Sequence, residues 1–251
     1  MSLAIDQFTY NQDNYGVLLH DGETGETALI DAGDATAALS ALESNGWELT
    51  QIWITHHHGD HTAGLQELVA ETNAEIFGPA GVAGIEQVMA DGGSFDFARL
   101  KVEVIATPGH TLDMLNYHLP QEKLVFTGDT LFAMGCGRLF EGDAAMMWAS
   151  LNRLMALGDD TIIYCGHEYT AANAAFALSV DPDHVALQRR AEAVAELRAA
   201  GAPTVPTIMA LEKETNPFLR AADTAIRDNL GLPSVPDEDV FAEIRRRKDS
   251  F

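Results

Sequence analysis

The chain has 251 residues, 47% of them apolar, which is enough for one large domain or for one domain with a smaller companion. Its formal net charge of −23 disfavours anionic partners, so neither nucleic acid nor a membrane surface is expected to bind. The sequence has no run of roughly 20 apolar residues, no signal-peptide pattern and only two cysteines, so we expect a cytoplasmic protein without a disulfide framework.

The first two thirds of the chain alternate short apolar runs with helical patterns, which predicts an α/β fold. Strands are expected at Tyr15–Leu19, Thr27–Ile30, Gln51–Ile54, Glu75–Phe77, Val102–Ala106, Met114–His118, Leu124–Phe126 and Ile162–Tyr164. Helices are expected at Ala35–Asn45, Thr62–Thr72, Ala144–Ala156 and Thr170–Ser179.

The composition changes after about residue 180, where the sequence indicates helices without further strands. Asp181-Pro182 is typical of a helix N-cap followed by proline in the first turn, and the Ala- and Glu-rich run that follows predicts a helix over 183–200. Two more helices are expected at 222–229 and 237–248. We therefore predict two domains, an α/β body over 1–173 and a small helical subdomain over 174–251.

The segment Thr55–His61 reads Thr-His-His-His-Gly-Asp-His and contains more possible metal ligands than any other part of the chain. It follows an apolar run and precedes a helical pattern. Positions two apart in an extended segment point the same way, so His56 and His58 can converge on one ion. Asp60 and His61, at the start of the next helix, can then face a neighbouring point. One segment could thus serve two ions.

Three more apolar runs end in a possible ligand that directly follows a glycine. These ligands are His110, Asp129 and His167. Binding sites of open α/β folds gather beyond the carboxyl ends of strands, so these side chains are expected to join the histidine segment. The remaining histidines are interpreted as non-ligands, namely His20, His57, His118 and His184.

The resulting set has five histidines, two aspartates and no cysteine. Nitrogen and oxygen donors of this kind suit zinc, iron or manganese, and zinc is the first expectation. Two ions about 3.5–4 Å apart lower the pKa of a shared water and supply hydroxide at neutral pH. This chemistry is suited to attack on an electrophilic carbonyl or phosphoryl centre.

The pattern T-H-x-H-x-D-H over 55–61 resembles the signature of the metallo-β-lactamase superfamily at every fixed position. The resemblance implies an αβ/βα four-layer sandwich with two mixed β-sheets. It also implies a first metal held by His56, His58 and His110, a second held by Asp60, His61 and His167, and Asp129 as the bridge between them.

Further segments resemble the glyoxalase II family, whose members hydrolyse S-2-hydroxyacylglutathione thioesters. They are Asp13-Asn14-Tyr15, Thr127–Phe132, Gly135–Arg138, Cys165–Thr170, Asn216–Arg220 and Arg245–Phe251. The resemblance implies that glutathione is bound by Arg138, Tyr169, Arg245 and Lys248. Phe140 stands where the family often has an aromatic hydroxyl, so one of the family's hydrogen bonds to glutathione cannot form.

The expected reaction is attack of a metal-bridging hydroxide on the thioester carbonyl, with Asp60 and Asp129 holding the nucleophile. The products are a 2-hydroxy acid, such as D-lactate, and glutathione, which places the reaction in methylglyoxal detoxification. A persulfide dioxygenase-like enzyme with one iron is the main alternative, followed by a β-lactamase or lactonase. A non-catalytic metal-binding protein is the non-enzyme alternative. A monomer is expected.

Overall fold

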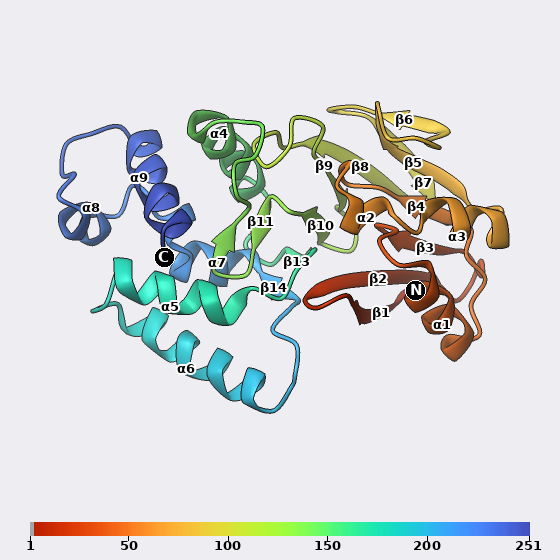
Figure 1. Cartoon of the computed structure of the whole chain (residues 1–251), viewed down its shortest axis with the longest axis horizontal. Helices are drawn as coiled ribbons and strands as arrows, with labels where there is room; N and C mark the ends of the chain where they lie inside the picture. The colour runs from red at the N-terminus through yellow and green to blue at the C-terminus, as the bar shows by residue number, and fades with distance from the viewer. Residues whose placement is uncertain (1–2) are drawn as a thin grey trace. The chain divides into compact units, whose positions relative to one another are not determined.

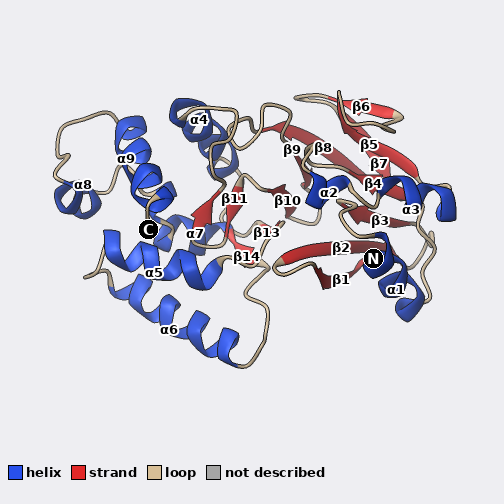
Figure 2. Cartoon of the chain, in the orientation of Figure 1, coloured by secondary structure: helices blue, strands red, loops and turns tan. Residues whose placement is uncertain are grey.

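A computed structural model describes residues 3–251 of the chain. These residues form two compact units, which Figure 1 traces by colour along the chain. Unit 1 contains the described residues up to Ala106 together with Asp113–Gly128, and unit 2 contains Thr107–Leu112 together with Asp129–Phe251. Most of the strands belong to unit 1 and most of the helices to unit 2 (Figure 2). The division between residues 173 and 174 stays a prediction.

The first sheet of unit 1 has the order β1-β2-β3-β4-β5-β6. Its strands are β1 Leu3–Tyr10, β2 Asn14–Asp21, β3 Thr27–Ile30, β4 Gln51–Trp53, β5 Glu75–Pro79 and β6 Gln87–Met89. The pairs from β1 to β3 are antiparallel, whereas those from β3 to β6 are parallel. The sheet is therefore mixed: β1 to β3 form a meander, and helices lie in the connections from β3 to β4 and from β4 to β5.

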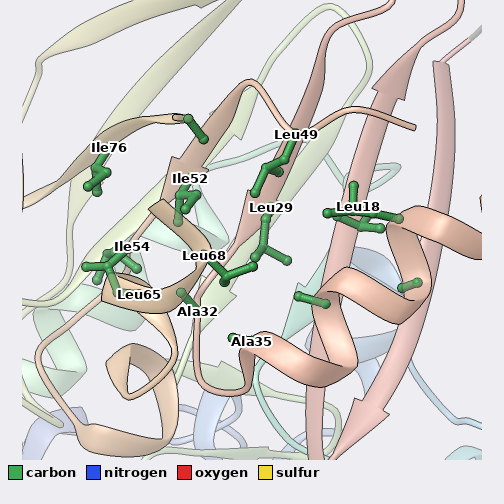
Figure 3. Packing of buried hydrophobic residues seen from close by; sticks show 14 residues of the cluster. Leu18, Leu29, Ala32, Ala35, Leu49, Ile52, Ile54, Leu65, Leu68 and Ile76 are labelled. Carbon is green, nitrogen blue, oxygen red and sulfur yellow. The ribbon is translucent and has the colours of Figure 1, made fainter. Parts of the chain in front are cut away.

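Two helices cover one face of this sheet, α1 Ala35–Asn45 and α3 Leu65–Thr72. The Asp34 side chain caps α1 by accepting a hydrogen bond from the Ala37 amide at 2.9 Å, and Gly46 ends the helix in the left-handed conformation. Leu18, Leu29 and Ile52 of the sheet pack against the helices in a buried cluster (Figure 3). This core fixes the position of β4, the strand that leads into the histidine segment.

The second sheet of unit 1 contains β7 Ser94–Phe97, β8 Leu100–Ala106, β9 Leu115–Leu119 and β10 Leu124–Gly128. All neighbouring pairs among these four strands are antiparallel. Trp53 of the first sheet packs edge-on against Phe95, Phe97 and Phe126 of the second, with ring centroids 5.3–6.1 Å apart. The two sheets thus face each other across an aromatic core.

Unit 2 consists mainly of helices. They are α4 Ala144–Met155, α5 Thr170–Val180, α6 Val185–Ala199, α7 Met209–Thr215, the 3-10 helix η1 Pro217–Leu219, α8 Thr224–Leu230 and α9 Asp237–Asp249. Phe218 of η1 lies between Phe176 of α5 and Phe241 of α9, with ring centroids 5.8 and 6.0 Å away. This aromatic row joins the helices into one small core.

Two short strand pairs accompany these helices in unit 2. A hairpin of β11 Leu131–Phe132 and β12 Gly135–Cys136 follows Asp129 directly. The second pair is β13 Ile162–Cys165 with β14 Thr207–Ile208, and it is antiparallel. Since β13 ends two residues before His167, both pairs adjoin predicted ligands.

The eight predicted strands and the helix at 35–45 are confirmed to within a few residues. The helix predicted over 62–72 is confirmed as α3, but its predicted start is wrong, because a separate short helix, α2 Gly59–Thr62, precedes it. Gly64 lies between them, and a Cβ there would approach the Ala35 nitrogen to 2.5 Å. The chain must turn at this point to pack against the start of α1.

The predicted N-cap at Asp181 is also wrong. Asp181 ends α5, and its carboxylate pairs with Arg220 at 2.8 Å. Helix α6 is capped instead by the His184 ring nitrogen, which accepts from the Leu187 amide at 3.1 Å.

Over residues 3–251, none of the helices combines the length and the apolar character needed to cross a membrane.

Candidate metal centre

The histidine segment of unit 1 follows β4. Its residues 55–58 have no regular structure, and Asp60 and His61 lie in α2. The Nε2 atom of His56 lies 3.1 Å from Nδ1 of His58. The His61 ring is 4.3 Å from the His56 ring, centroid to centroid, and its Nε2 atom is 3.5 Å from Asp60 Oδ2. Unit 1 therefore brings its four predicted ligands into one group.

A buried carboxylate supports two of these histidines from behind. Asp31 Oδ2 lies 2.8 Å from Nδ1 of His61. The same carboxylate accepts hydrogen bonds from the Thr55 amide and hydroxyl, and the Thr55 hydroxyl lies 3.0 Å from Nδ1 of His56. These contacts fix the Nδ1 side of both rings, which is how proteins usually orient metal-ligating histidines.

Asp60 is held from both its side chain and its backbone. The Asn14 amide donates to Asp60 Oδ2 at 3.0 Å, and the Tyr10 hydroxyl donates to the Asp60 carbonyl at 2.8 Å. The Asp60 carbonyl oxygen would lie 1.9 Å from a Cβ at position 33, so only Gly33 fits there. The carboxylate of Asp60 is thus preset although it is 41% exposed.

His57 does not join the group. Its ring is 42% exposed, and Nδ1 lies 3.0 Å from Asp113 Oδ1. His56 and His58, on either side of it, instead bring their ring nitrogens within 3.1 Å of each other. The interpretation of His57 as a non-ligand fits its exposure and its contact with Asp113.

Unit 2 groups the other three predicted ligands, all of them buried. The Nε2 atoms of His110 and His167 lie 3.4 and 3.2 Å from Asp129, and both distances are to the same oxygen, Oδ2. Nδ1 of His110 lies 2.8 Å from the Arg138 carbonyl oxygen, which orients this ring from its far side. One oxygen of Asp129 therefore lies beside both histidines.

The separations within each group fit ligands of a tetrahedral ion. Two donors about 2.1 Å from zinc, at a tetrahedral angle, lie about 3.4 Å apart. The four donor pairs described above have separations of 3.1, 3.5, 3.4 and 3.2 Å. The donors are imidazole nitrogens and carboxylate oxygens, and the chain carries His and Asp groups able to hold metal ions.

Three of the predicted glutathione-binding residues lie close together in unit 2. Arg138 is exposed, and its Nε atom is 3.7 Å from Asp249 Oδ1. The Arg245 guanidinium is buried, donates to the Cys136 carbonyl at 3.0 Å and pairs with Asp249 at 2.8 Å. Burial, followed by the charges of Arg245 and Arg138, holds the pKa of Lys248 below its usual value. Asp249 thus lies within ion-pair distance of two of the three cations, Arg138 and Arg245.

The fourth residue, Tyr169, adjoins a predicted ligand. Its ring stacks on His167, with centroids 4.7 Å apart and an interplanar angle of 4°. Phe140 is 60% exposed, and its ring lies 5.2 Å from that of His110. Aromatic side chains therefore flank both of the predicted ligand histidines of unit 2, His110 and His167.

The two cysteines are unsuited to nucleophilic catalysis. Both are buried, and burial raises the pKa of the Cys136 thiol to about 11 and that of the Cys165 thiol to about 12. Only the thiolate is an effective nucleophile. At neutral pH neither residue can take that role.

Sequence reasoning missed the residues that support the ligands. Asp31 carries the buried carboxylate described above and has a positive φ of 61°. The sequence feature that could have revealed Asp31 is the Asp-x-Gly-Asp run directly after β3. Like the predicted ligands, Asp31 is a polar residue that directly follows a strand. Asn14 was recognised only as part of a motif, and its role as the donor to Asp60 appears in the structure.

Two family models match the chain. The metallo-β-lactamase superfamily model matches residues 12–86 and 82–167, and the model of the hydroxyacylglutathione hydrolase C-terminus matches residues 168–251. Together they cover nearly the whole chain, and they include all seven predicted ligands.

Solved structures share the fold. The crystal structure of ETHE1 from Myxococcus xanthus is 26% identical, with a TM-score of 0.71 over 97% of this chain and 90% of that one. A metallo-β-lactamase from Staphylococcus aureus is 20% identical, with a TM-score of 0.66 over 98% of this chain and 71% of that one. The predicted metallo-β-lactamase sandwich with two mixed sheets and a helical C-terminal region is therefore confirmed.

Full-length relatives are much more similar in sequence. A hydroxyacylglutathione hydrolase from Rhizobium meliloti is 55% identical over 100% of this chain and 99% of its own length. One from Brucella ovis is 54% identical over 99% of this chain and 98% of its own length. The chain belongs to the hydroxyacylglutathione hydrolase family, within the metallo-β-lactamase superfamily.

Proposed function

We propose that this chain hydrolyses S-(2-hydroxyacyl)glutathione thioesters, such as S-D-lactoylglutathione, to a 2-hydroxy acid and glutathione, and that it serves in methylglyoxal detoxification. The relatives that match it end to end are hydroxyacylglutathione hydrolases, which makes the chain a metal-dependent hydrolase. The observation that carries the proposal is the shared Asp129 oxygen beside His110 and His167, since one bridging carboxylate is what a two-metal hydrolase needs.

Seven residues would hold two divalent ions. His56, His58 and His110 form the first set, and Asp60, His61 and His167 form the second, with Asp129 common to both. When bound, the ions would lower the pKa of a shared water and polarise the thioester carbonyl. We propose zinc for both positions, with iron and manganese as alternatives that the same donors accept.

The two carboxylates would position the nucleophile. Asp129 is buried between two histidine nitrogens, so its charge is fixed in a site from which water is largely excluded. Asp60 is partly exposed and oriented by Asn14, so it can accept a hydrogen bond from the attacking water and hold it toward the carbonyl carbon.

The substrate is an anionic peptide thioester, and the chain has a net charge of −23. Local cations are therefore needed to bind it. Arg138 and Lys248, with Arg245 behind them, supply such cations, and the Tyr169 ring next to His167 would bind beside the thioester. We further propose a cytoplasmic monomer with a metal-binding domain over 1–173 and a substrate-binding domain over 174–251, and no nucleic-acid or membrane partner.

The experiment that tests this function is turnover of S-D-lactoylglutathione by the purified protein, with elemental analysis of the same sample. We expect hydrolysis and two metal ions per chain. Asp129→Ala should abolish hydrolysis and reduce the bound metal, whereas Asp113→Asn, which alters only the partner of His57, should change neither. Retention of both activity and metal in Asp129→Ala would refute the scheme.

Oxygen uptake distinguishes the proposed hydrolase from the main alternative, a persulfide dioxygenase-like enzyme. A persulfide dioxygenase-like enzyme would hold one iron and consume oxygen with a persulfide substrate. The proposed hydrolase should consume none. Oxygen consumption without thioester hydrolysis would replace the proposed function by that alternative.

A further inference from the structure

One buried carboxylate in the helical part of unit 2 contacts the hairpin that follows Asp129. Glu212 of α7 has no exposed surface. Its Oε2 atom accepts a hydrogen bond from the Met134 amide at 2.8 Å, at the tip of the hairpin, where Met134 has a positive φ of 59°. The left-handed conformation of Met134 costs energy, and the hydrogen bond to Glu212 offsets that cost.

A neighbouring side chain strengthens this hold. Asn216 donates through its amide to Glu212 Oε2 at 3.1 Å, to the Gly135 carbonyl at 3.0 Å and to the Phe132 carbonyl at 3.3 Å. Its own Oδ1 accepts from the Phe218 amide. The hairpin therefore donates a hydrogen bond to Glu212 and accepts hydrogen bonds from Asn216, and both side chains lie more than 70 positions later in the sequence.

The other oxygen of Glu212 reaches the second strand pair. Oε1 accepts from the Thr207 hydroxyl at 2.7 Å, and Thr207 belongs to β14, which pairs with β13. Arg190 of α6 forms a buried ion pair with the same oxygen and also donates to Thr207 at 3.0 Å. One carboxylate thus joins the hairpin after Asp129 to the strand pair before His167.

The hairpin in turn sets the geometry of two predicted ligands. Where it ends, a Cβ at Gly137 would lie 2.0 Å from the Asp129 carbonyl oxygen and 3.1 Å from the His110 Cβ, so the backbone packs directly against both. The next carbonyl, that of Arg138, lies 2.8 Å from Nδ1 of His110. A shift of the hairpin would therefore move Asp129 and His110 relative to each other.

We infer that the Arg190–Glu212 pair, with Asn216, is a positioning element for the metal centre. It would keep Asp129, His110 and His167 at ligand spacing although it contacts none of them. The helical C-terminal region would then set metal affinity in addition to binding substrate. This inference rests on the proposed function, because it takes those three residues to be metal ligands.

The test is a chelator titration of the metal-loaded protein, in which the free chelator concentration that removes half of the metal is measured. Glu212→Gln keeps the shape of the side chain but replaces one acceptor oxygen by an amide donor. Either the contacts to the hairpin side or those to Thr207 and Arg190 are therefore lost, whichever way the amide is oriented. We expect metal release at about tenfold lower chelator concentration, the lower end of the effect of an outer-shell contact. Asn216→Ala removes the hydrogen bonds to the Phe132 and Gly135 carbonyls and leaves the Met134–Glu212 hydrogen bond in place, and it should shift release in the same direction.

The matched control is Asp181→Asn. Asp181 is also a buried carboxylate paired with an arginine, Arg220, but it does not contact the hairpin. It should lose thermal stability comparably and release metal as the unaltered protein does. The inference is overturned if Glu212→Gln and Asn216→Ala both keep the unaltered release point, or if Asp181→Asn shifts it equally. Unaltered protein that holds no metal would refute the proposed function instead.

Discussion

The two units hold their predicted ligands in different ways. Unit 1 holds four of them in one heptapeptide, Thr55–His61, in which the carboxylate of Asp31 directly contacts the ring of His61. Unit 2 holds three predicted ligands in segments that span 110–167, and their support comes from the hairpin and from helices still later in the chain. A compact ligand group can thus be oriented locally, whereas a dispersed one depends on the packing of a whole subdomain.

The largest effect is expected when the local support is removed. Asp31→Asn replaces an acceptor that serves the Thr55 amide, the Thr55 hydroxyl and His61. Because it contacts a predicted ligand directly, we expect metal affinity to fall by about 10- to 100-fold. A competition titration against a zinc chelator measures the change.

This result would sharpen the difference between the units if Asp31→Asn has a larger effect than Glu212→Gln. Asp113→Asn is the control, because Asp113 pairs with His57, the histidine of the same segment that is not a predicted ligand. An equal loss of affinity in Asp113→Asn and Asp31→Asn would show that the segment responds to any altered charge nearby.

A smaller effect is expected from the cations of unit 2. The ammonium of Lys248, one of the predicted glutathione-binding groups, donates to the Ala172 carbonyl at 3.0 Å and lies over the rings of Phe176 and Phe251, which hold the charge in position. Removing one charge-assisted contact costs about 1.5 kcal/mol, so Lys248→Ala should raise KM about tenfold with kcat nearly unchanged. Initial rates over a range of S-D-lactoylglutathione concentrations test this.

Arg245→Ala should behave differently from Lys248→Ala. The Arg245 guanidinium is buried and donates to the Cys136 carbonyl, so its loss should lower the unfolding temperature as well as raise KM. The variant Arg246→Ala, in an exposed ion pair with Glu243, is the control for charge alone. A KM unchanged in both Arg245→Ala and Lys248→Ala would remove α9 from the substrate site.

The smallest effect concerns alkaline pH and again separates the units, since both cysteines lie in unit 2. Burial raises the pKa of Cys136 to about 11 and that of Cys165 to about 12, from 9.0. The folded protein therefore keeps thiol protons that the unfolded chain releases. This contribution to stability is complete below pH 9 and is lost as the pH rises toward those values.

Urea unfolding at several pH values between about 8 and 10 measures this loss. Each thiol contributes a slope of at most about 1.4 kcal/mol per pH unit. Cys136→Ala with Cys165→Ala should flatten the dependence of the unfolding free energy on pH. A slope that is the same with and without the thiols would assign the alkaline sensitivity to other groups.

Much of the fold could be predicted from the sequence because short apolar runs mark the buried strands. The strands Gln51–Trp53 and Leu124–Gly128 are buried at every residue, and most of their residues are apolar. Strand β1 was missed because its residues are only partly buried and alternate weakly. Strands β11, β12 and β14 have two residues each, too few for any periodicity to appear.

The site was predictable to the extent that its chemistry is concentrated in short motifs. His56 and His58 could be paired from their spacing, and the three glycine-preceded ligands from their positions at strand ends. Asp31, Glu212 and Asn216 could not be found in this way. Their roles come from contacts with residues 24–84 positions away, and such contacts leave no pattern in the local sequence.

The placement of the three tryptophans has a practical consequence for spectroscopy. Trp53 lies in the aromatic layer between the sheets of unit 1, Trp47 stacks on His20 with centroids 4.5 Å apart, and Trp148 of unit 2 lies 5.8 Å from Phe241. Each indole is in a distinct environment, so replacing two of them by phenylalanine leaves a fluorophore specific to one unit. Emission from such variants would reveal whether the halves melt together or one after the other.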